Sequence, residues 1–225
     1  MMWRREDVGD CVFCDMAEDG ASVHWQFLLG EEQGTDVLRR GNEYSIALDT
    51  APIVPGHMLV IPKGHYTSMA QVPVSYWPEL EDHKGWVKRL LNQKYSESVS
   101  FFEHGAGDIV RRAGACVDHA HLHVVPGDYN IEPILRRSYP NLRLFGNQAD
   151  AFDFFGKQPY IYLENSSGKI YGAEAPECSS QFLRRLFAAA AGKPQRWNWR
   201  DCIRLADEMG IRNEIRELKE HASSM

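Results

Sequence analysis

The sequence has no long apolar run: nothing in its 225 residues approaches the roughly 18 that a membrane-spanning helix requires. The first ten residues, MMWRREDVGD, carry basic side chains but no apolar segment behind them, so we expect no secretory signal. No long lysine and arginine run offsets the net charge of −6, which argues against tracking along a nucleic-acid backbone. These absences leave a small anionic ligand, rather than a membrane or a nucleic acid, as the compatible kind of partner.

Cysteine is scarce, with five residues, of which only Cys11 and Cys14 lie close together. An odd number of cysteines without a secretory signal indicates reduced thiols, so we expect a cytoplasmic protein. A Cys-x-x-Cys pair in a reducing compartment is typical of a zinc site or of a redox pair. No βαβ pattern of the thioredoxin type surrounds this pair, so zinc is the favoured interpretation.

The stretch VDHAHLHVVP (117–126) has histidines at three alternate positions. In a strand, alternate side chains point to the same face, so His119, His121 and His123 share a face while the apolar residues between them enter the core. Imidazoles buried without a ligand would leave nitrogen atoms without hydrogen bonds. The pattern predicts a nucleophile with neighbouring donors, suited to attack on phosphorus. The alternative is a structural metal site or a set of hydrogen-bonded polar residues. The metallo-hydrolase pattern His-x-His-x-Asp-His does not fit.

Hydrophobic periodicity predicts a mixture of strands and helices. Strands are expected over 44–49, 57–62, 98–105 and 117–126, and a long helix from about residue 73 to 95. A loop-rich connection (127–158) precedes a hairpin formed by PYIYLE and KIYGAE. A helix in SSQFLRRLFAAAAG and a last charged helix from about Asn213 complete the prediction. The arginines of SSQFLRRLF can hold an anion near a helix N-terminus, but an amphipathic helix that docks onto the core is the favoured interpretation.

A second candidate stretch is DTAPIVPGHMLVIPKGH (49–65), in which His57 begins a strand and His65 follows its end. A histidine after Pro-Lys-Gly is, taken alone, more often a surface loop residue. Combined with Cys11 and Cys14, it gives a zinc set, because two thiolates and two imidazoles satisfy a tetrahedral cation.

Together these stretches resemble the histidine triad (HIT) superfamily, whose hallmark is His-φ-His-φ-His-φ-φ. The upstream Cys-x-x-Cys makes the chain similar to the zinc-containing branch, and the resemblance covers about residues 10–127. It implies an α+β fold with a HIT-like antiparallel sheet of five strands and a long helix, plus a C-terminal extension of strands and helices. We expect a nucleotide-binding catalytic domain over 1–130 and an extension over 131–225 that packs on it.

The resemblance also implies a role for each matching residue. His121 is the nucleophile, which attacks the α-phosphorus of a nucleotide and forms a covalent nucleotidyl-enzyme. His123 and His57 help to orient and protonate the leaving group, and Asp49 accepts hydrogen bonds from ribose hydroxyls. The implied ligands of a structural zinc ion are Cys11, Cys14, His65 and His119, with His104 as a rival ligand or phosphate contact.

The chain departs from the family pattern at two places. Many relatives have Gly-Gln-Ser/Thr before the triad, whereas GAC (114–116) stands here and puts Cys116 beside the phosphate. Glu103 replaces an asparagine that relatives often have. Arg111 and Arg112, in the loop before the triad, could supply the missing positive charge, although paired loop arginines are usually solvated. With Asp49, these residues form the predicted substrate-binding set.

The favoured function is hydrolysis at the α-phosphate of a dinucleoside polyphosphate or a nucleoside phosphoramidate. Two alternatives stay open: a nucleotidyltransferase that passes the nucleotide to a second substrate, and a nucleotide-binding protein with little catalytic activity, which the GAC sequence favours. The resemblance implies a small-molecule nucleotide partner and a homodimer, because family members are often dimers. As a hypothesis, the extension covers the nucleotide site and selects the group beyond the α-phosphate.

Overall fold

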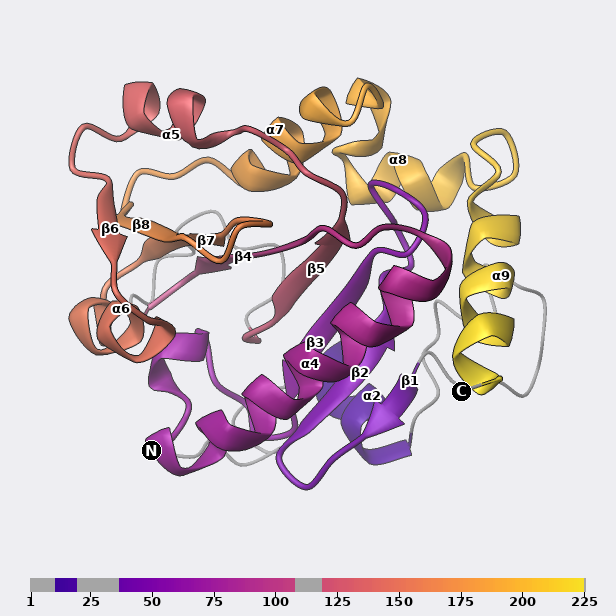
Figure 1. Ribbon diagram of the computed structural model, residues 1–225, viewed down its shortest axis with the longest axis horizontal. Helices are drawn as coiled ribbons and strands as arrows, with labels where there is room; N and C mark the ends of the chain where they lie inside the picture. Colours follow the sequence, from indigo (N-terminus) through magenta and orange to yellow (C-terminus); the bar gives the residue numbers. More distant parts are fainter. Residues whose placement is uncertain (1–10, 20–36, 108–118, 225) are drawn as a thin grey trace.

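One antiparallel sheet of eight strands runs through the part of the chain that the structure describes (Figure 1). The structure is a computed structural model and describes residues 11–19, 37–107 and 119–224. Neighbouring strands follow the order β1-β2-β3-β5-β4-β7-β8-β6. The strands are β1 (Val37–Arg40), β2 (Tyr44–Leu48), β3 (Met58–Pro62), β4 (Val99–Gly105), β5 (Leu122–Pro126), β6 (Arg143–Phe145), β7 (Tyr160–Glu164) and β8 (Ile170–Glu174).

The first five of these strands and one long helix form the predicted α+β unit. They are adjacent in the order β1-β2-β3-β5-β4, and the 18-residue helix α4 (Trp77–Lys94) lies across one face (Figure 1). Proline at the start of α4 suits the first helical turn, where a backbone N–H would have no partner within the helix. Leu80, Val87 and Leu91 recur at helical spacing and are fully buried, which explains why this segment is helical. The α+β fold class is confirmed.

The C-terminal extension, residues 131–225, continues the same sheet instead of forming a second one. Strand β7 pairs with β4 from Phe101 opposite Glu164 to Gly105 opposite Tyr160. Strands β8 and β6 then extend the sheet further. The tight turn between β7 and β8 uses Gly168, whose φ of 77° favours glycine. The hydrogen-bonded sheet thus crosses residue 130, and the division into two domains stays a prediction.

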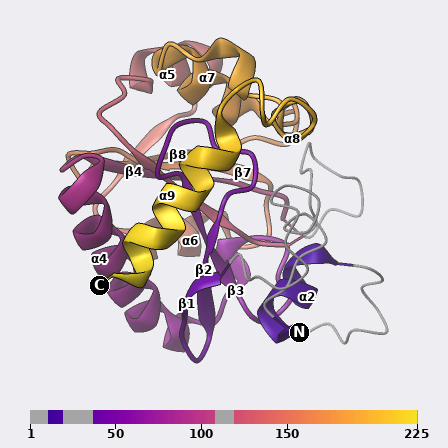
Figure 2. The same cartoon turned by 90° about the vertical axis from the view of Figure 1, so that its right-hand side faces the viewer.

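The two faces of the sheet are covered by different helices. On one face, Ile46, Val60 and Phe101 share a core with α4 and with α6 (Gln148–Phe155). On the other face, Leu59 packs in a cluster with α2 (Val12–Asp19), and Phe102 packs in a cluster with α7 (Phe182–Ala190). Figure 2 shows α4 and α2 on opposite sides of the strands. The candidate site lies on the face that α2 and α7 cover.

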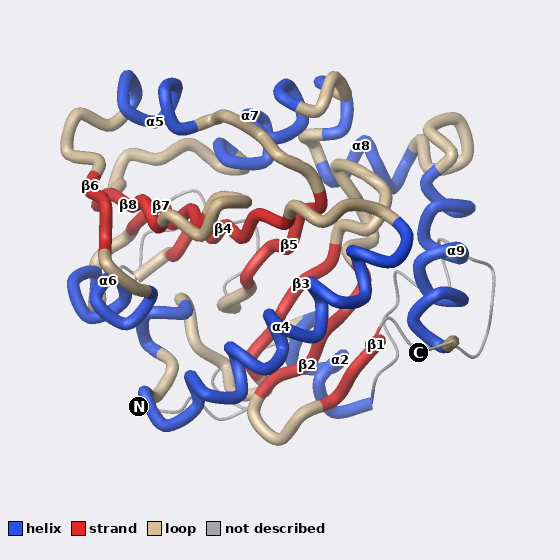
Figure 3. Tube along the Cα trace, in the orientation of Figure 1, coloured by secondary structure: helices blue, strands red, loops and turns tan. Residues whose placement is uncertain are grey.

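Helix α9 (Ile211–Ser223) closes the β1 end of the molecule (Figure 3). Ile215 and Leu218 are buried in the main core, and His221 Nε2 donates to the carbonyl oxygen of Leu90 in α4 at 3.0 Å. The other described α-helices are α5 (Glu132–Ser138) and α8 (Trp199–Arg204). None of the helices in the described ranges combines the length and apolar character needed to cross a bilayer.

Three elements occupy the stretch in which the sequence predicts a loop-rich connection. They are α5, β6 and α6, which lie between residues 132 and 155. The Asn147 side chain caps α6 by accepting a hydrogen bond from Asp150 N–H at 2.9 Å. On the inner face of α6, the side chains of Phe152 and Phe155 are buried. Such short elements depend on tertiary packing and carry no long periodic pattern, so the prediction of loop was wrong.

Candidate active site

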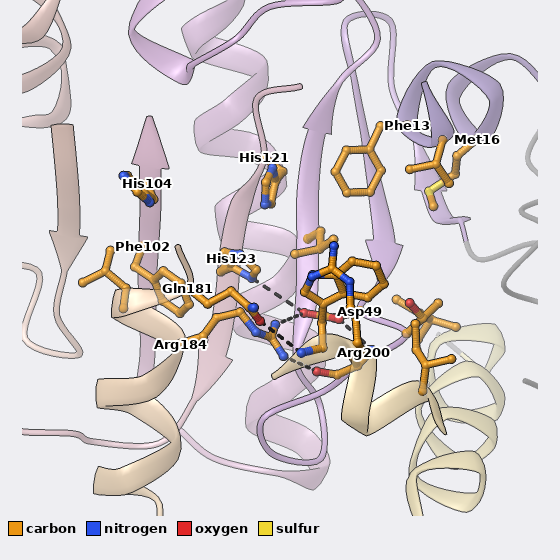
Figure 4. A pocket seen from close by; sticks show the side chains of 18 of the residues that line it. Phe13, Met16, Asp49, Phe102, His104, His121, His123, Gln181, Arg184 and Arg200 are labelled. Carbon is orange, nitrogen blue, oxygen red and sulfur yellow. Dashed lines mark hydrogen bonds and ion pairs between the residues drawn. The ribbon is translucent and has the colours of Figure 1, made fainter. Parts of the chain in front are cut away.

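A cavity of about 340 Å³ lies on the face of the sheet that α2 and α7 cover, between the histidine stretch and the extension (Figure 4). Its size falls near the lower end of ligand pockets, which measure roughly 300 to 1,000 Å³. One wall is apolar and includes Phe13 and Met16 of α2. Polar side chains reach the cavity from two sides: His104, His121 and His123 from the sheet, and Gln181, Arg184 and Arg200 from the extension.

His121 presents one ring nitrogen to this cavity. Its Nδ1 lies 2.8 Å from the carbonyl oxygen of His119, so Nδ1–H donates and Nε2 keeps its lone pair. The ring packs against Phe13 and His123, with centroid separations of 5.2 and 4.9 Å. Burial lowers the pKa of His121, which keeps the imidazole neutral near pH 7. The His121 ring is therefore held as a neutral base with a free nitrogen.

The alternation predicted for the histidine stretch holds, although regular pairing begins late. Strand β5 starts at Leu122, so His119 and His121 precede it, and residues 117 and 118 lie outside the described ranges. The intervening residues Ala120, Leu122 and Val124 are all buried in the main core. The three imidazoles consequently emerge on the opposite side.

His57 and His123 form a hydrogen-bonded pair beside the cavity. The Nδ1 atom of His57 accepts from Ile53 N–H at 3.1 Å, which places the proton of a neutral His57 on Nε2. This Nε2–H donates to His123 Nδ1 at 3.0 Å, so the proton of His123 belongs on its Nε2. Burial lowers the pKa of His57 to about 4 and that of His123 well below its usual value. The chain of donors thus ends at His123 Nε2–H.

Asp49, at the end of β2, is the carboxylate that neighbours this histidine pair. Its Oδ2 lies 3.3 Å from His57 Nε2 and 2.8 Å from Arg184 Nη1, and its Oδ1 accepts from Ala51 N–H at 2.8 Å. Burial raises the pKa of Asp49, but His57, Arg184 and His123 outweigh that effect and hold it well below its usual range. Asp49 is therefore ionised and already surrounded by donors.

Arg184 connects this carboxylate to the extension. Its guanidinium donates to Asp49, to the carbonyl oxygen of Ala51 and to that of Trp197, so every one of its nitrogens has an acceptor. In α7, Arg184 lies on the buried stripe that also includes Leu183 and Phe187. The amphipathic helix thus docks onto the core, as favoured from the sequence, and carries a buried arginine with it.

A second cluster brings together two cysteines and two histidines from distant parts of the chain. Ligand atoms of Cys11, Cys14, His65 and His119 all lie within 4.8 Å of one another. Cys14 Sγ is 3.3 Å from His65 Nδ1 and 3.5 Å from His119 Nδ1. Hydrogen bonding from Cys14 lowers the pKa of the Cys11 thiol, although burial opposes it.

The donor geometry of this cluster fits a zinc ion. Tetrahedral ligands at the usual Zn–S and Zn–N distances stand about 3.6 Å apart, close to the sulfur–nitrogen separations seen here. His119 Nε2 lies 2.8 Å from the carbonyl oxygen of Pro62, so Nε2–H donates and Nδ1 faces the thiols with its lone pair. Both the residue types and the tautomer of His119 suit a metal ligand.

Comparison with known proteins decides the family. A sequence model of the HIT domain matches residues 31–130. The chain is also 30% identical to the uncharacterized HIT-like protein Rv1262c of Mycobacterium tuberculosis over an alignment of 117 residues. The alignment covers 52% of this chain and 70% of that protein. The chain belongs to the histidine triad family. The matched domain ends before Arg184 and the other extension residues that reach the cavity.

This histidine triad protein has further similarities. It is 27% identical over 115 residues to adenosine 5′-monophosphoramidase HNT1 of Candida albicans, covering 49% of this chain and 73% of that protein. Among solved structures, a zinc-bound histidine triad family protein from Mycobacterium smegmatis matches with a TM-score of 0.38 and 24% identity, covering 52% of this chain and 74% of that chain.

The structure places the predicted substrate-binding residues of this histidine triad protein differently from one another. Asp49 lines the cavity. Glu103 does not: it lies on the α4 face, where Tyr160 O–H and Met69 N–H donate to its carboxyl group. Burial raises the pKa of Glu103 to about 8. The adjacent residue, His104, faces the cavity instead, and it lies outside the Cys–His cluster. The placement expected for Glu103 is corrected accordingly.

Three predicted residues, Arg111, Arg112 and Cys116, lie outside the described residues. From the sequence, an anion-binding role for the arginines of SSQFLRRLF, which include Arg184, was only the less favoured interpretation, and the contribution of Gln181 and Arg200 to the cavity was missed. The available signal was an arginine on the apolar stripe of the predicted helix 179–192, because a buried arginine requires a partner.

Proposed function

We propose that this protein cleaves a nucleotide at its α-phosphate through a covalent intermediate on His121. The observation that carries the proposal is the hydrogen bond from His121 Nδ1–H to His119 O, which leaves the Nε2 lone pair facing a cavity of ligand size. Nucleophilic catalysis requires a nitrogen that is unprotonated and fixed in orientation, and this arrangement supplies both.

The proposed reaction has two displacement steps. In the first, His121 Nε2 forms a bond to the α-phosphorus while the bond from phosphorus to the leaving group breaks, and the electron pair of the broken bond stays on the leaving group. A phosphate departs as its anion, whereas an amine takes up one proton from solvent and departs neutral. His123 Nε2–H supplies a hydrogen bond on the cavity side, and His57 holds that tautomer in place. In the second step, water attacks phosphorus and gives up a proton to solvent, while the nitrogen–phosphorus bond breaks and its electron pair returns to His121 Nε2. A nucleoside monophosphate is released.

The nucleoside is expected to lie against the apolar wall that Phe13 and Met16 form, because a nucleobase stacks favourably on apolar and aromatic groups. Substrates of the proposed class are dinucleoside polyphosphates and nucleoside phosphoramidates. The similarity to a protein named adenosine 5′-monophosphoramidase supports the second of these.

We also propose that Cys11, Cys14, His65 and His119 hold a structural zinc ion. When bound, the ion would link α2 to the segment just before the nucleophile and so fix the position of that segment. Since α2 carries Phe13 onto His121, this brace also positions the apolar wall.

The test is capture of the intermediate with a nucleotide radiolabelled at the α-phosphate. A bond between histidine and phosphorus is stable in base and labile in acid, so a base-quenched sample should retain label on the protein. His121→Asn should remove both the label and turnover while the fold is kept. His221→Asn, a matched change on the outer helix α9, should leave both unchanged.

The outcomes of this experiment separate the candidate functions. Labelled protein that releases nucleoside monophosphate in water alone supports hydrolysis. Labelled protein that turns over only with an added acceptor indicates a nucleotidyltransferase. Turnover by His121→Asn at more than a tenth of the wild-type rate, or nucleotide binding without any label, would overturn the proposal.

A further inference from the structure

We propose that Arg200 and Gln181, both from the C-terminal extension, form a subsite for an anionic leaving group. The preferred substrate then carries at least one phosphate beyond the α-phosphate. This inference rests on the proposed function, because it concerns the group that departs when His121 attacks.

The position of these residues is the first argument. Arg200 is the second residue of the short helix α8, and Gln181 immediately precedes α7. Both line the cavity from the side opposite the sheet, facing the imidazoles of His121 and His123 (Figure 4). Arg200 and Gln181 thus lie across the cavity from His121. We place the phosphate beyond the α-phosphate on that side.

Gln181 and Arg200 also keep hydrogen-bond donors available to a ligand. The Gln181 side-chain oxygen accepts from Trp199 N–H at 3.0 Å, so the amide NH₂ is the group left for the cavity. The guanidinium of Arg200 lies over the Trp199 ring, 4.4 Å from its centroid, which restricts its orientation. Both residues therefore offer hydrogen-bond donors, which suit phosphate oxygens.

Charge balance supplies the third argument. Asp49 is the one carboxylate among the described residues that line the cavity, and Arg184 neutralises it at 2.8 Å. Arg184 is itself committed to Asp49, Ala51 and Trp197. Across the described ranges, no carboxylate lies within ion-pair distance of the exposed Arg200. Arg200 thus leaves a net positive charge on the extension wall.

These contacts act on the step in which the leaving group departs. When the phosphorus–oxygen bond breaks, the electron pair stays on the bridging oxygen, and the departing phosphate gains negative charge. A guanidinium beside that phosphate stabilises the developing charge. A phosphoramidate, whose leaving group is an amine, has no distal phosphate and gains nothing from Arg200.

The experiment compares two substrates that give the same intermediate on His121. One is adenosine 5′-phosphoramidate, and the other is a diadenosine triphosphate; both transfer adenosine monophosphate. We expect Arg200→Gln to lower kcat/KM for the triphosphate by about 10- to 100-fold, the usual effect of one charge-assisted hydrogen bond, and to change it for the phosphoramidate by less than about twofold. Arg200→Lys should lie between, and Gln181→Leu should act in the same direction as Arg200→Gln.

Arg204→Gln is the matched control, because Arg204 lies on the same helix, is exposed and pairs with Asp201 away from the cavity. It should change neither substrate. An equal loss for both substrates, or no loss for either, would overturn the inference while His121 labelling persists. Wild-type turnover of the phosphoramidate alone would also overturn it. Absence of label on His121 with both substrates would instead remove the proposed function, and this inference with it.

Discussion

Replacing Arg184 by methionine tests how strongly the extension is tied to Asp49 and the neighbouring pair of His57 and His123. The ion pair between Arg184 and Asp49 is buried, with side-chain exposures of 7% and 8%. Removing one partner of a buried pair leaves the other charge without compensation and costs about 3 to 5 kcal/mol. We expect Arg184→Met to lower the free energy of unfolding by an amount in this range, measured by urea denaturation at pH 7.

Two further variants make this prediction specific. Asp49→Asn added to Arg184→Met should recover part of the lost stability, because no lone carboxylate is then buried. Arg185→Met is the matched control: Arg185 lies over the Trp197 ring at 5.4 Å and contacts Ser179 at the surface, so its loss should cost less than about 1 kcal/mol. A loss below about 1 kcal/mol for Arg184→Met would refute the reasoning.

Three other outcomes are expected. Cys14→Ser should lower the zinc content, measured by elemental mass spectrometry, well below that of wild type, whereas Cys178→Ser should not; equal zinc in both variants would contradict the four-ligand site. Burial holds the pKa of His57 and of His104 at about 4, below the usual 6.5. Because the unfolded chain takes up these protons first, the free energy of unfolding should fall between pH 6.5 and 4, by about 1.4 kcal/mol per pH unit for each histidine. Urea midpoints that do not change across this window would contradict the assignment. Finally, Glu103→Gln should leave kcat/KM within about twofold, since Glu103 lies on the face away from the cavity; a tenfold loss would show that it contacts the substrate.

The histidine stretch could be understood from sequence because its information is local. Alternation of apolar and imidazole side chains fixes which residues share a face, whatever the rest of the chain does. The spacing of Cys11 and Cys14 is equally local, and the chemistry of thiolates limited their partners to a few histidines. These patterns grouped His65 with the two cysteines, whereas His119 was added only by the resemblance to the histidine triad family; the structure brings all four residues together.

Contacts with the extension could not be derived in this way. Arg184 and Asp49 are separated by 135 positions, and no periodicity connects them. Strand β4 shows a related problem: six of its seven residues are buried, so burial does not distinguish one face from the other. The sequence therefore could not decide whether Glu103 or His104 faces the cavity, and the packing of α4 and α7 on opposite sides decides it.

The stereochemical course at the α-phosphorus tests most directly whether His121 forms a covalent intermediate. The substrate is a nucleotide with sulfur on the α-phosphorus in known configuration, cleaved in water enriched in oxygen-18. Two in-line displacements invert the configuration twice, so the account predicts a product with retained configuration. Inverted configuration would mean that water attacks the nucleotide directly, and it would contradict a nucleophilic His121.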